Sequence, residues 1–160
     1  MTHIRQADPG DASQVAEIWN WMIAETPRTF TTALKTTAAM QTAIMTRGVG
    51  FLVACEGDEV LGFATYFPFR DGPGYAFTKE HSIVLHPRAN GQGIGRRLME
   101  RLEAAARSEG VHSLIAGVSG ENPDGVAFHA AIGFTEVARI PEVGRKYDRW
   151  MDLVIMQKIL

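Results

Sequence analysis

Three glycines fall within five residues, at Gly91, Gly93 and Gly95, and they separate two segments of opposite character. Residues 75–86 before them alternate as a strand does, and residues 94–109 after them carry apolar side chains at helical spacing. Glycines at the start of a helix leave main-chain N–H groups bare, and such a helix end binds phosphate. The same pattern also fits a tight turn before a solvated basic helix face, and the spacing alone leaves both interpretations open.

Positive charge gathers around this loop although the chain as a whole is slightly acidic. The chain has 16 Lys and Arg against 18 Asp and Glu, a net charge of -2, which disfavours a general nucleic-acid binder. Beside the glycines, only Glu100 opposes four arginines, Arg88, Arg96, Arg97 and Arg101. The run reads G-x-G-x-G, not G-x-G-x-x-G, and no G-x-x-x-x-G-K-[ST] occurs, so neither a dinucleotide site nor a P-loop is expected.

Length and composition bound the size of the fold. With 160 residues, of which 46% are apolar, the chain can bury one sizeable core, and we expect a single domain over residues 1–160. The one cysteine, Cys55, excludes an internal disulfide. No apolar run approaches the ~20 residues that span a bilayer, and residues 1–11 do not read as a secretory signal. We therefore expect a cytoplasmic protein, with neither a membrane nor a nucleic acid as partner.

The hydrophobic pattern predicts an ordered mixture of helices and strands. A first helix follows Asp11, a good N-cap, and ends at Pro27. Further helices are expected at about 36–46, 94–109 and 123–132, and strands at 51–55, 60–69, 75–86, 112–118, 134–140 and 150–158. This order predicts an α/β fold in which a mixed, mostly antiparallel sheet is flanked by helices on both faces.

The glycine loop and the order of elements resemble the GNAT superfamily of acetyl-CoA-dependent N-acetyltransferases. The run from Asn90 to Gly95, NGQGIG, is similar to the family's [QR]-x-x-G-x-[GA] motif, with Asn90 in place of the usual Gln or Arg. The glycines match, and the loop lies between a long strand and a helix, as the family's motif does.

Three further segments resemble the phosphinothricin and methionine sulfoximine acetyltransferases of that superfamily. Thr78–Ile83, TKEHSI, is similar to the T-V-E-H-S-[IV] strand of that subfamily. Asn122 is followed seven residues later by His129 and then by an I-G-F run at 132–134. Val143–Leu153 is similar to the signature V-G-x-K-[FY]-x-R-W-x-D-[LV]. The likeness covers nearly the whole chain and is weakest over residues 25–50.

The resemblance implies a GNAT fold that uses acetyl-CoA as co-substrate. It implies direct acetylation, without an acetyl-enzyme, of the α-amine of a small amino acid or amino-acid analogue. Two alternatives stay open: an enzyme of the same family that acts on a polyamine, an antibiotic or a protein N-terminus, and a non-catalytic acyl-CoA-binding module. The histidines lack the spaced partners of a metal site, so we expect no metal. Because relatives form dimers, we expect a homodimer.

Glu80 and His129 are the catalytic candidates. A carboxylate on a central strand can have its pKa raised by burial, which suits Glu80 as the general base, directly or through a water molecule. His129 stands where many GNAT proteins carry a tyrosine that protonates the leaving thiolate, and an imidazole can give or take a proton near neutral pH. The alternatives are a structural carboxylate paired with an arginine and a structural histidine.

The resemblance also assigns residues to acetyl-CoA. Main-chain groups of Ile83, Val84 and Leu85 are expected to bind the pantetheine arm, with a bulge turning one N–H toward the thioester oxygen. Asn122 can cap its helix and also bind that arm. The pyrophosphate is expected on the residues of the loop and first helical turn, Gly91, Gln92, Gly93, Ile94, Gly95 and Arg96.

For the acceptor amine, Phe30 and Arg70 are similar to the subfamily's aromatic wall and carboxylate-binding arginine. Arginine suits a carboxylate because its planar fork pairs with two oxygens at once. This chain has Ala76 where relatives often have a second arginine, and Gly125 in place of the usual serine after Asn122. A weaker or different grip on the carboxylate is therefore expected. Separately, the signature residues Lys146, Tyr147 and Trp150 can bind substrate or brace the final strands.

Overall fold

The computed structural model describes residues 1–160, and a seven-stranded sheet forms its centre. In sheet order the strands are β1 (His3–Gln6), β2 (Phe51–Glu56), β3 (Glu59–Pro68), β4 (Thr78–Leu85), β5 (Ser113–Ser119), β7 (Arg149–Ile159) and β6 (Thr135–Lys146). All neighbouring strands are antiparallel except β4 and β5, which run parallel. The expected mixed, mostly antiparallel sheet is confirmed.

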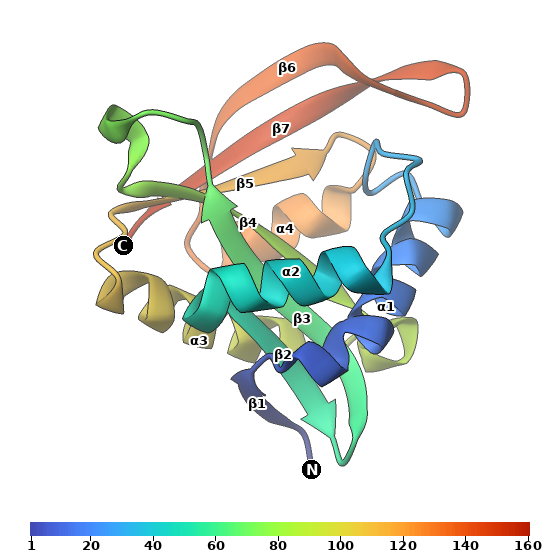
Figure 1. The fold of residues 1–160 in the computed structure, drawn as a ribbon. Helices are drawn as coiled ribbons and strands as arrows, with labels where there is room; N and C mark the ends of the chain where they lie inside the picture. The colour runs from blue at the N-terminus through green and yellow to red at the C-terminus, as the bar shows by residue number, and fades with distance from the viewer.

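Four α-helices cover both faces of this sheet. They are α1 (Ala12–Glu25), α2 (Thr37–Arg47), α3 (Ile94–Ser108) and α4 (Pro123–Ala131). Helices α1 and α2 lie on one face, and α3 and α4 on the other (Figure 1). Successive residues of a strand point to opposite faces, so Leu52 of β2 joins the core under α3 while Val53 joins the core under α1 and α2. None of the helices combines the length and apolar content that crossing a membrane requires.

The beginning of the chain differs from the sequence prediction. Strand β1, which was not predicted, pairs with β2 at the edge of the sheet. Asp11 does not cap α1 through its side chain. Its carboxylate instead accepts hydrogen bonds from Arg5 at 2.7 Å and from the N–H of Asp8 at 2.7 Å. The ion pair with Arg5 fastens the start of α1 to β1.

Two strand boundaries also differ. Strand β4 begins at Thr78 and not at residue 75, because Pro73–Tyr75 forms a 3-10 turn. The closing hairpin is longer than predicted: β6 and β7 continue to a tight turn at Tyr147 and Asp148, both with positive φ. Figure 1 shows this hairpin extending beyond the body of the sheet.

Candidate active site

The sheet opens where its two parallel strands separate. Strands β4 and β5 pair only from Thr78 with Ser113 to His81 with Ala116, whereas both strands continue further. Main-chain groups of β4 beyond His81 therefore lack a strand partner on the side of β5. The opening forms part of a cleft of about 760 Å³ that also reaches α1, α3 and α4.

Nine of the ten residues expected to bind the cofactor line this cleft. They are Ile83, Val84, Leu85, Gly91, Gly93, Ile94, Gly95, Arg96 and Asn122. Gln92 is not among the lining residues, and its side-chain amide donates a hydrogen bond to the carbonyl of Arg88 at 2.8 Å. Because this side chain is bonded to Arg88, Gln92 is expected to contribute to cofactor binding only through its main chain.

The glycine loop presents the N-terminus of α3 to the cleft. Gly91 and Gly93 have φ of 75° and 74°, the left-handed conformation that glycine adopts without a steric cost. Gly93 precedes α3 and provides no side-chain cap, so the N–H groups of the first turn stay available. Gly95 serves packing: a Cβ there would lie 3.3 Å from the Phe128 ring. This end of the cleft suits a phosphate group.

The bulge expected in β4 is absent. Its pairing with β3 runs without a register shift from Gly62 with Leu85 to Pro68 with Lys79. The prediction was wrong: main-chain groups of β4 are exposed by its separation from β5 beyond His81, and β4 itself stays regular.

Glu80 lines the cleft and lies in the paired part of β4, opposite Ile115 of β5. Its Oε2 would lie 3.8 Å from a Cβ built on Gly117, so the carboxylate stands beside a residue that has no side chain to cover it. It is partly buried, no cation pairs with it, and burial raises its pKa. The pairing with an arginine that a structural role implied does not occur. A carboxylate with a raised pKa is suited to proton transfer near neutral pH.

His129 is hydrogen-bonded at both ring nitrogens. Its Nδ1 lies 2.7 Å from the carbonyl oxygen of Gly125, which can only accept, so Nδ1 carries the ring proton. The Nε2 of a neutral ring is then bare, and it accepts from the Nε2 of His81 at 3.0 Å. His81 and His129 are 5% and 6% exposed. His129 therefore offers no free N–H to the cleft in this arrangement.

Burial keeps this histidine pair neutral. It lowers the pKa of His129, and burial together with the neighbouring His129 lowers the pKa of His81 to about 3. The Nδ1 of His81 has no hydrogen-bond partner. A neutral pair with its shared proton on His81 favours a positioning role for His129 over that of an acid.

Asn122 caps α4, accepting a hydrogen bond from the N–H of Gly125 at 3.0 Å. The glycine at 125 makes this close approach possible, because a Cβ there would overlap the Asn122 side chain and lie 3.1 Å from Val118. The Asn122 side chain remains at the wall of the cleft. Capping and ligand binding are thus compatible.

Phe30 and Arg70, the predicted acceptor residues, are not among the residues that line the cleft. The Phe30 ring packs on Gly144 of β6, where an added Cβ would overlap it. Arg70 is exposed, and its guanidinium lies 5.5 Å from the centre of the Tyr75 ring. The segment after α1 instead contributes Arg28 and Thr29 to the cleft.

Lys146 connects the C-terminal hairpin to this segment. The residue is 4% exposed, and its ammonium donates to the carbonyls of Ile23 at 2.7 Å, Thr26 at 2.8 Å and Thr29 at 3.0 Å. These carbonyls lie at and beyond the C-terminus of α1, where a positive charge is favourable. Lys146 thus braces the fold, and one of its partners, Thr29, lines the cleft. The sequence analysis predicted neither the hydrogen-bond partners of Lys146 nor the position of Arg28 in the cleft. The lysine of the C-terminal signature was the only sequence feature that pointed to this region.

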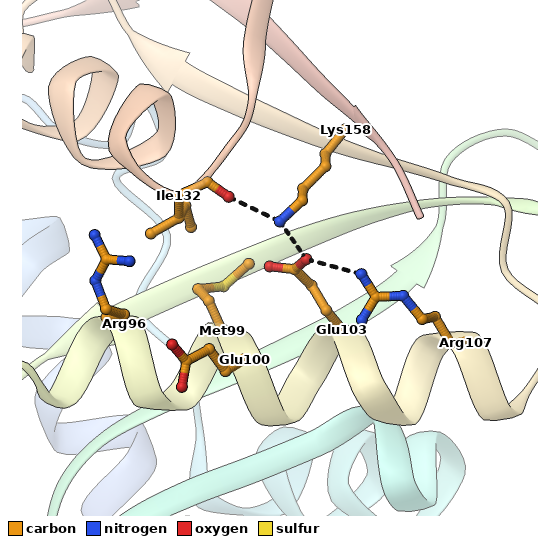
Figure 2. A pocket seen from close by; sticks show the side chains of 7 residues that line it. All are labelled: Arg96, Met99, Glu100, Glu103, Arg107, Ile132 and Lys158. Carbon is orange, nitrogen blue, oxygen red and sulfur yellow. Dashed lines mark hydrogen bonds and ion pairs between the residues drawn. The ribbon is translucent and has the colours of Figure 1, made fainter.

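A second, smaller pocket of about 290 Å³ lies along α3. Figure 2 shows Lys158 of β7 reaching the carbonyl of Ile132 at 2.7 Å and the carboxylate of Glu103 at 2.6 Å, with Arg107 on the other side of Glu103 at 3.7 Å. Glu103 thus forms ion pairs with both Lys158 and Arg107. This cluster fixes the end of α4 against α3, the two helices between which the cleft opens.

Comparison with known proteins agrees with this geometry. The family model described as Acetyltransferase (GNAT) family matches residues 15–134. An L-methionine sulfoximine/L-methionine sulfone acetyltransferase of Salmonella typhimurium is 36% identical over 157 residues, which cover 96% of this chain and 92% of that protein.

Two solved structures are similar over almost their full length. A GNAT superfamily phosphinothricin acetyltransferase from Sinorhizobium meliloti, in complex with AcCoA, has a TM-score of 0.92 and 31% identity, covering 99% of this chain and 88% of that one. A ribosomal-protein-alanine N-acetyltransferase from Brucella melitensis has a TM-score of 0.94 and 35% identity, covering 99% of both chains.

Proposed function

Because this chain belongs to the acetyltransferase (GNAT) family, we propose that it transfers the acetyl group of acetyl-CoA directly to the α-amine of a small amino acid or amino-acid analogue. The acceptor is of the methionine sulfoximine or phosphinothricin type. The observation that carries the proposal is one cleft that is lined both by an uncapped helix N-terminus and by a partly buried, unpaired carboxylate.

The lining residues fit acetyl-CoA. The glycine loop and the first-turn N–H groups of α3 would hold the pyrophosphate, with Arg96 adding positive charge. Unpaired main-chain groups of Ile83–Leu85, together with Asn122, would hold the pantetheine arm. When bound, the cofactor supplies an acetyl group activated as a thioester.

Glu80 accepts the proton that the attacking amine gives up as the new C–N bond forms and the C–S bond breaks. A main-chain N–H within Ile83–Leu85 stabilises the negative charge that develops on the carbonyl oxygen. The thiolate leaves with the bonding electrons. His129, held by His81 and Gly125, borders this place and positions the reacting groups, and it can give up a proton at Nε2 only when the pair holds an additional one.

Substitution of Glu80 tests the mechanism. We expect Glu80→Gln to lower kcat by roughly 10²–10⁴-fold, the usual contribution of a general base, and to leave acetyl-CoA binding unchanged by calorimetry. Glu17→Gln, on the exposed side of α1, is the matched control and should keep full activity. Acetyl transfer by Glu80→Gln at more than half of the wild-type rate would show that Glu80 is not the base.

An acceptor panel tests the substrate class. It contains L-methionine sulfoximine, phosphinothricin, spermidine, an aminoglycoside and a peptide with an N-terminal alanine. The likeness to a ribosomal-protein-alanine N-acetyltransferase favours a protein N-terminus as the second candidate. Turnover of the peptide alone would replace the amino-acid proposal by that one. Binding of acetyl-CoA without turnover of any amine would indicate a binding module.

A homodimer in the cytoplasm completes the proposal. Apolar side chains are exposed along the β6–β7 hairpin, among them Val137, Val143 and Trp150 at 53%, 51% and 57% exposure, and β6 is an edge strand. Cys55 is buried and free, as a reducing compartment permits. Light scattering coupled to size exclusion measures the mass: a value near that of one 17.6 kDa chain would contradict the dimer.

A further inference from the structure

Two arginines line the cleft, and they come from different elements of the fold. Arg96 lies in the first turn of α3, beside the glycine loop. Arg28 lies in the segment that follows α1, and the cleft there is also lined by Trp21, Met22 and Thr29. Since Arg96 is the arginine proposed to bind the pyrophosphate, Arg28 is the remaining arginine of the cleft that could bind an anionic acceptor.

The backbone around Arg28 is firmly held. Its N–H donates to Thr26 Oγ1 at 3.2 Å, and that hydroxyl donates to the carbonyl of Met22 at 2.7 Å. Lys146 binds the carbonyls of Thr26 and Thr29, so the chain is fixed on both sides of Arg28. The site of the side chain is therefore set before any ligand arrives.

The guanidinium of Arg28, by contrast, has no partner within the protein. It makes neither an ion pair nor a hydrogen bond, and the residue is exposed. Arg5, Arg88 and Arg149 each pair with a carboxylate. A cation that is unpaired on a fixed backbone is free to bind an anionic ligand.

The geometry points to Arg28 as the residue that binds the α-carboxylate of the acceptor, with Trp21 and Met22 beside the acceptor's side chain. This inference rests on the proposed function. In an α-amino acid one carbon separates the amine from the carboxylate, so an amine at Glu80 requires a cation that borders the same cleft. Arg28 meets this condition and Arg70 does not. The planar fork of arginine then pairs with both carboxylate oxygens.

L-methionine sulfone and its carboxamide provide the test, because the amide replaces the carboxylate that Arg28 would bind with a neutral group of similar size. We expect Arg28→Gln to raise KM for the acid at least tenfold, with KM for the amide and for acetyl-CoA within twofold of wild type. Arg28→Lys should restore part of the loss, since a point charge replaces the fork. Arg145→Gln, an exposed arginine on β6, is the control and should change none of these values.

The outcomes separate this inference from the proposed function. If Arg28→Gln keeps the wild-type ratio of acid to amide, or if Arg70→Gln removes it instead, Arg28 is not the carboxylate ligand while the acetylation of amino acids stands. If the wild-type enzyme acetylates the amide as well as the acid, the inference is also overturned. If it acetylates neither the acid nor any other α-amino acid, the proposed function itself fails.

Discussion

The buried ammonium of Lys146 supports a prediction that can be worked out in numbers. Lys146→Met keeps most of the length and apolar volume of the side chain and removes all three donors. The carbonyls of Ile23, Thr26 and Thr29 then lose their charged partner, and the bonds to the first two are fully buried. No carboxylate is left unpaired, because Lys146 takes part in no ion pair.

The expected cost follows from two opposing contributions. A hydrogen bond from a charged donor contributes about 1.5–3 kcal/mol, so three give roughly 4.5–9 kcal/mol in total. Removal of the ammonium also relieves its desolvation, the cause that lowers the pKa of Lys146. We expect a net loss of about 3 kcal/mol in the free energy of unfolding, comparable to breaking a buried ion pair. At about 3 °C per kcal/mol for a chain of this size, Tm falls by about 9 °C.

Urea unfolding followed by tryptophan fluorescence measures this loss as a lower midpoint at unchanged slope. Because the segment held by Lys146 carries Arg28 and Thr29, KM for the amine should also rise while KM for acetyl-CoA stays constant. Arg145→Met, one residue away on the exposed side of β6, should cost under about 1 kcal/mol. A loss below about 1 kcal/mol for Lys146→Met would refute the reasoning, since the carbonyls would then be satisfied by water.

Two further changes test the histidine pair and the glycine loop. The pKa of His81 is about 3 in the folded protein and ~6.5 in the unfolded chain. Below pH 6.5 the unfolded chain therefore binds more protons, and the free energy of unfolding decreases as the pH is lowered. When the pH is lowered from 7 to 5, the free energy of unfolding in urea should fall by about 2 kcal/mol more for the wild type than for His81→Phe. An equal fall in both proteins would mean that His81 is not held neutral. Gly93→Ala, at φ 74°, should cost about 1 kcal/mol and weaken acetyl-CoA binding in calorimetry, whereas Gly74→Ala, without positive φ, should do neither; equal affinities would exclude a role of the loop conformation.

Local patterns in the sequence predicted the fold closely, because most elements carry their own signal. The helical spacing after Gly93 and the alternation around Glu80 each predict one element without reference to the rest of the chain. Strand β1 carries no such signal: it has four residues and is held by pairing with β2 at the sheet edge. Asp11 shows the same limit, because its carboxylate binds the distant Arg5 instead of the helix end that it precedes.

The residues of the candidate site also fall into those that a local motif predicts and those that only distant contacts place. The glycine loop, Glu80 and Asn122 lie within short motifs, and the structure brings them to one cleft. The partners of Lys146 lie 117 to 123 residues away in the chain, so spacing cannot indicate them. Arg28 falls in the stretch where motifs are weakest, and its place in the cleft depends on that distant lysine.

The short contact between β4 and β5 has a mechanical consequence. Four residue pairs, from Thr78 with Ser113 to His81 with Ala116, join one half of the sheet to the other. A ligand arm bound along the free edges of β4 and β5 beyond His81 would connect the two halves of the sheet next to this short contact. Glu80 lies within this contact, so main-chain pairing with β5 fixes its position at the start of the opening. The same four pairs thus hold the two halves of the sheet together and place the proposed base where the opening begins.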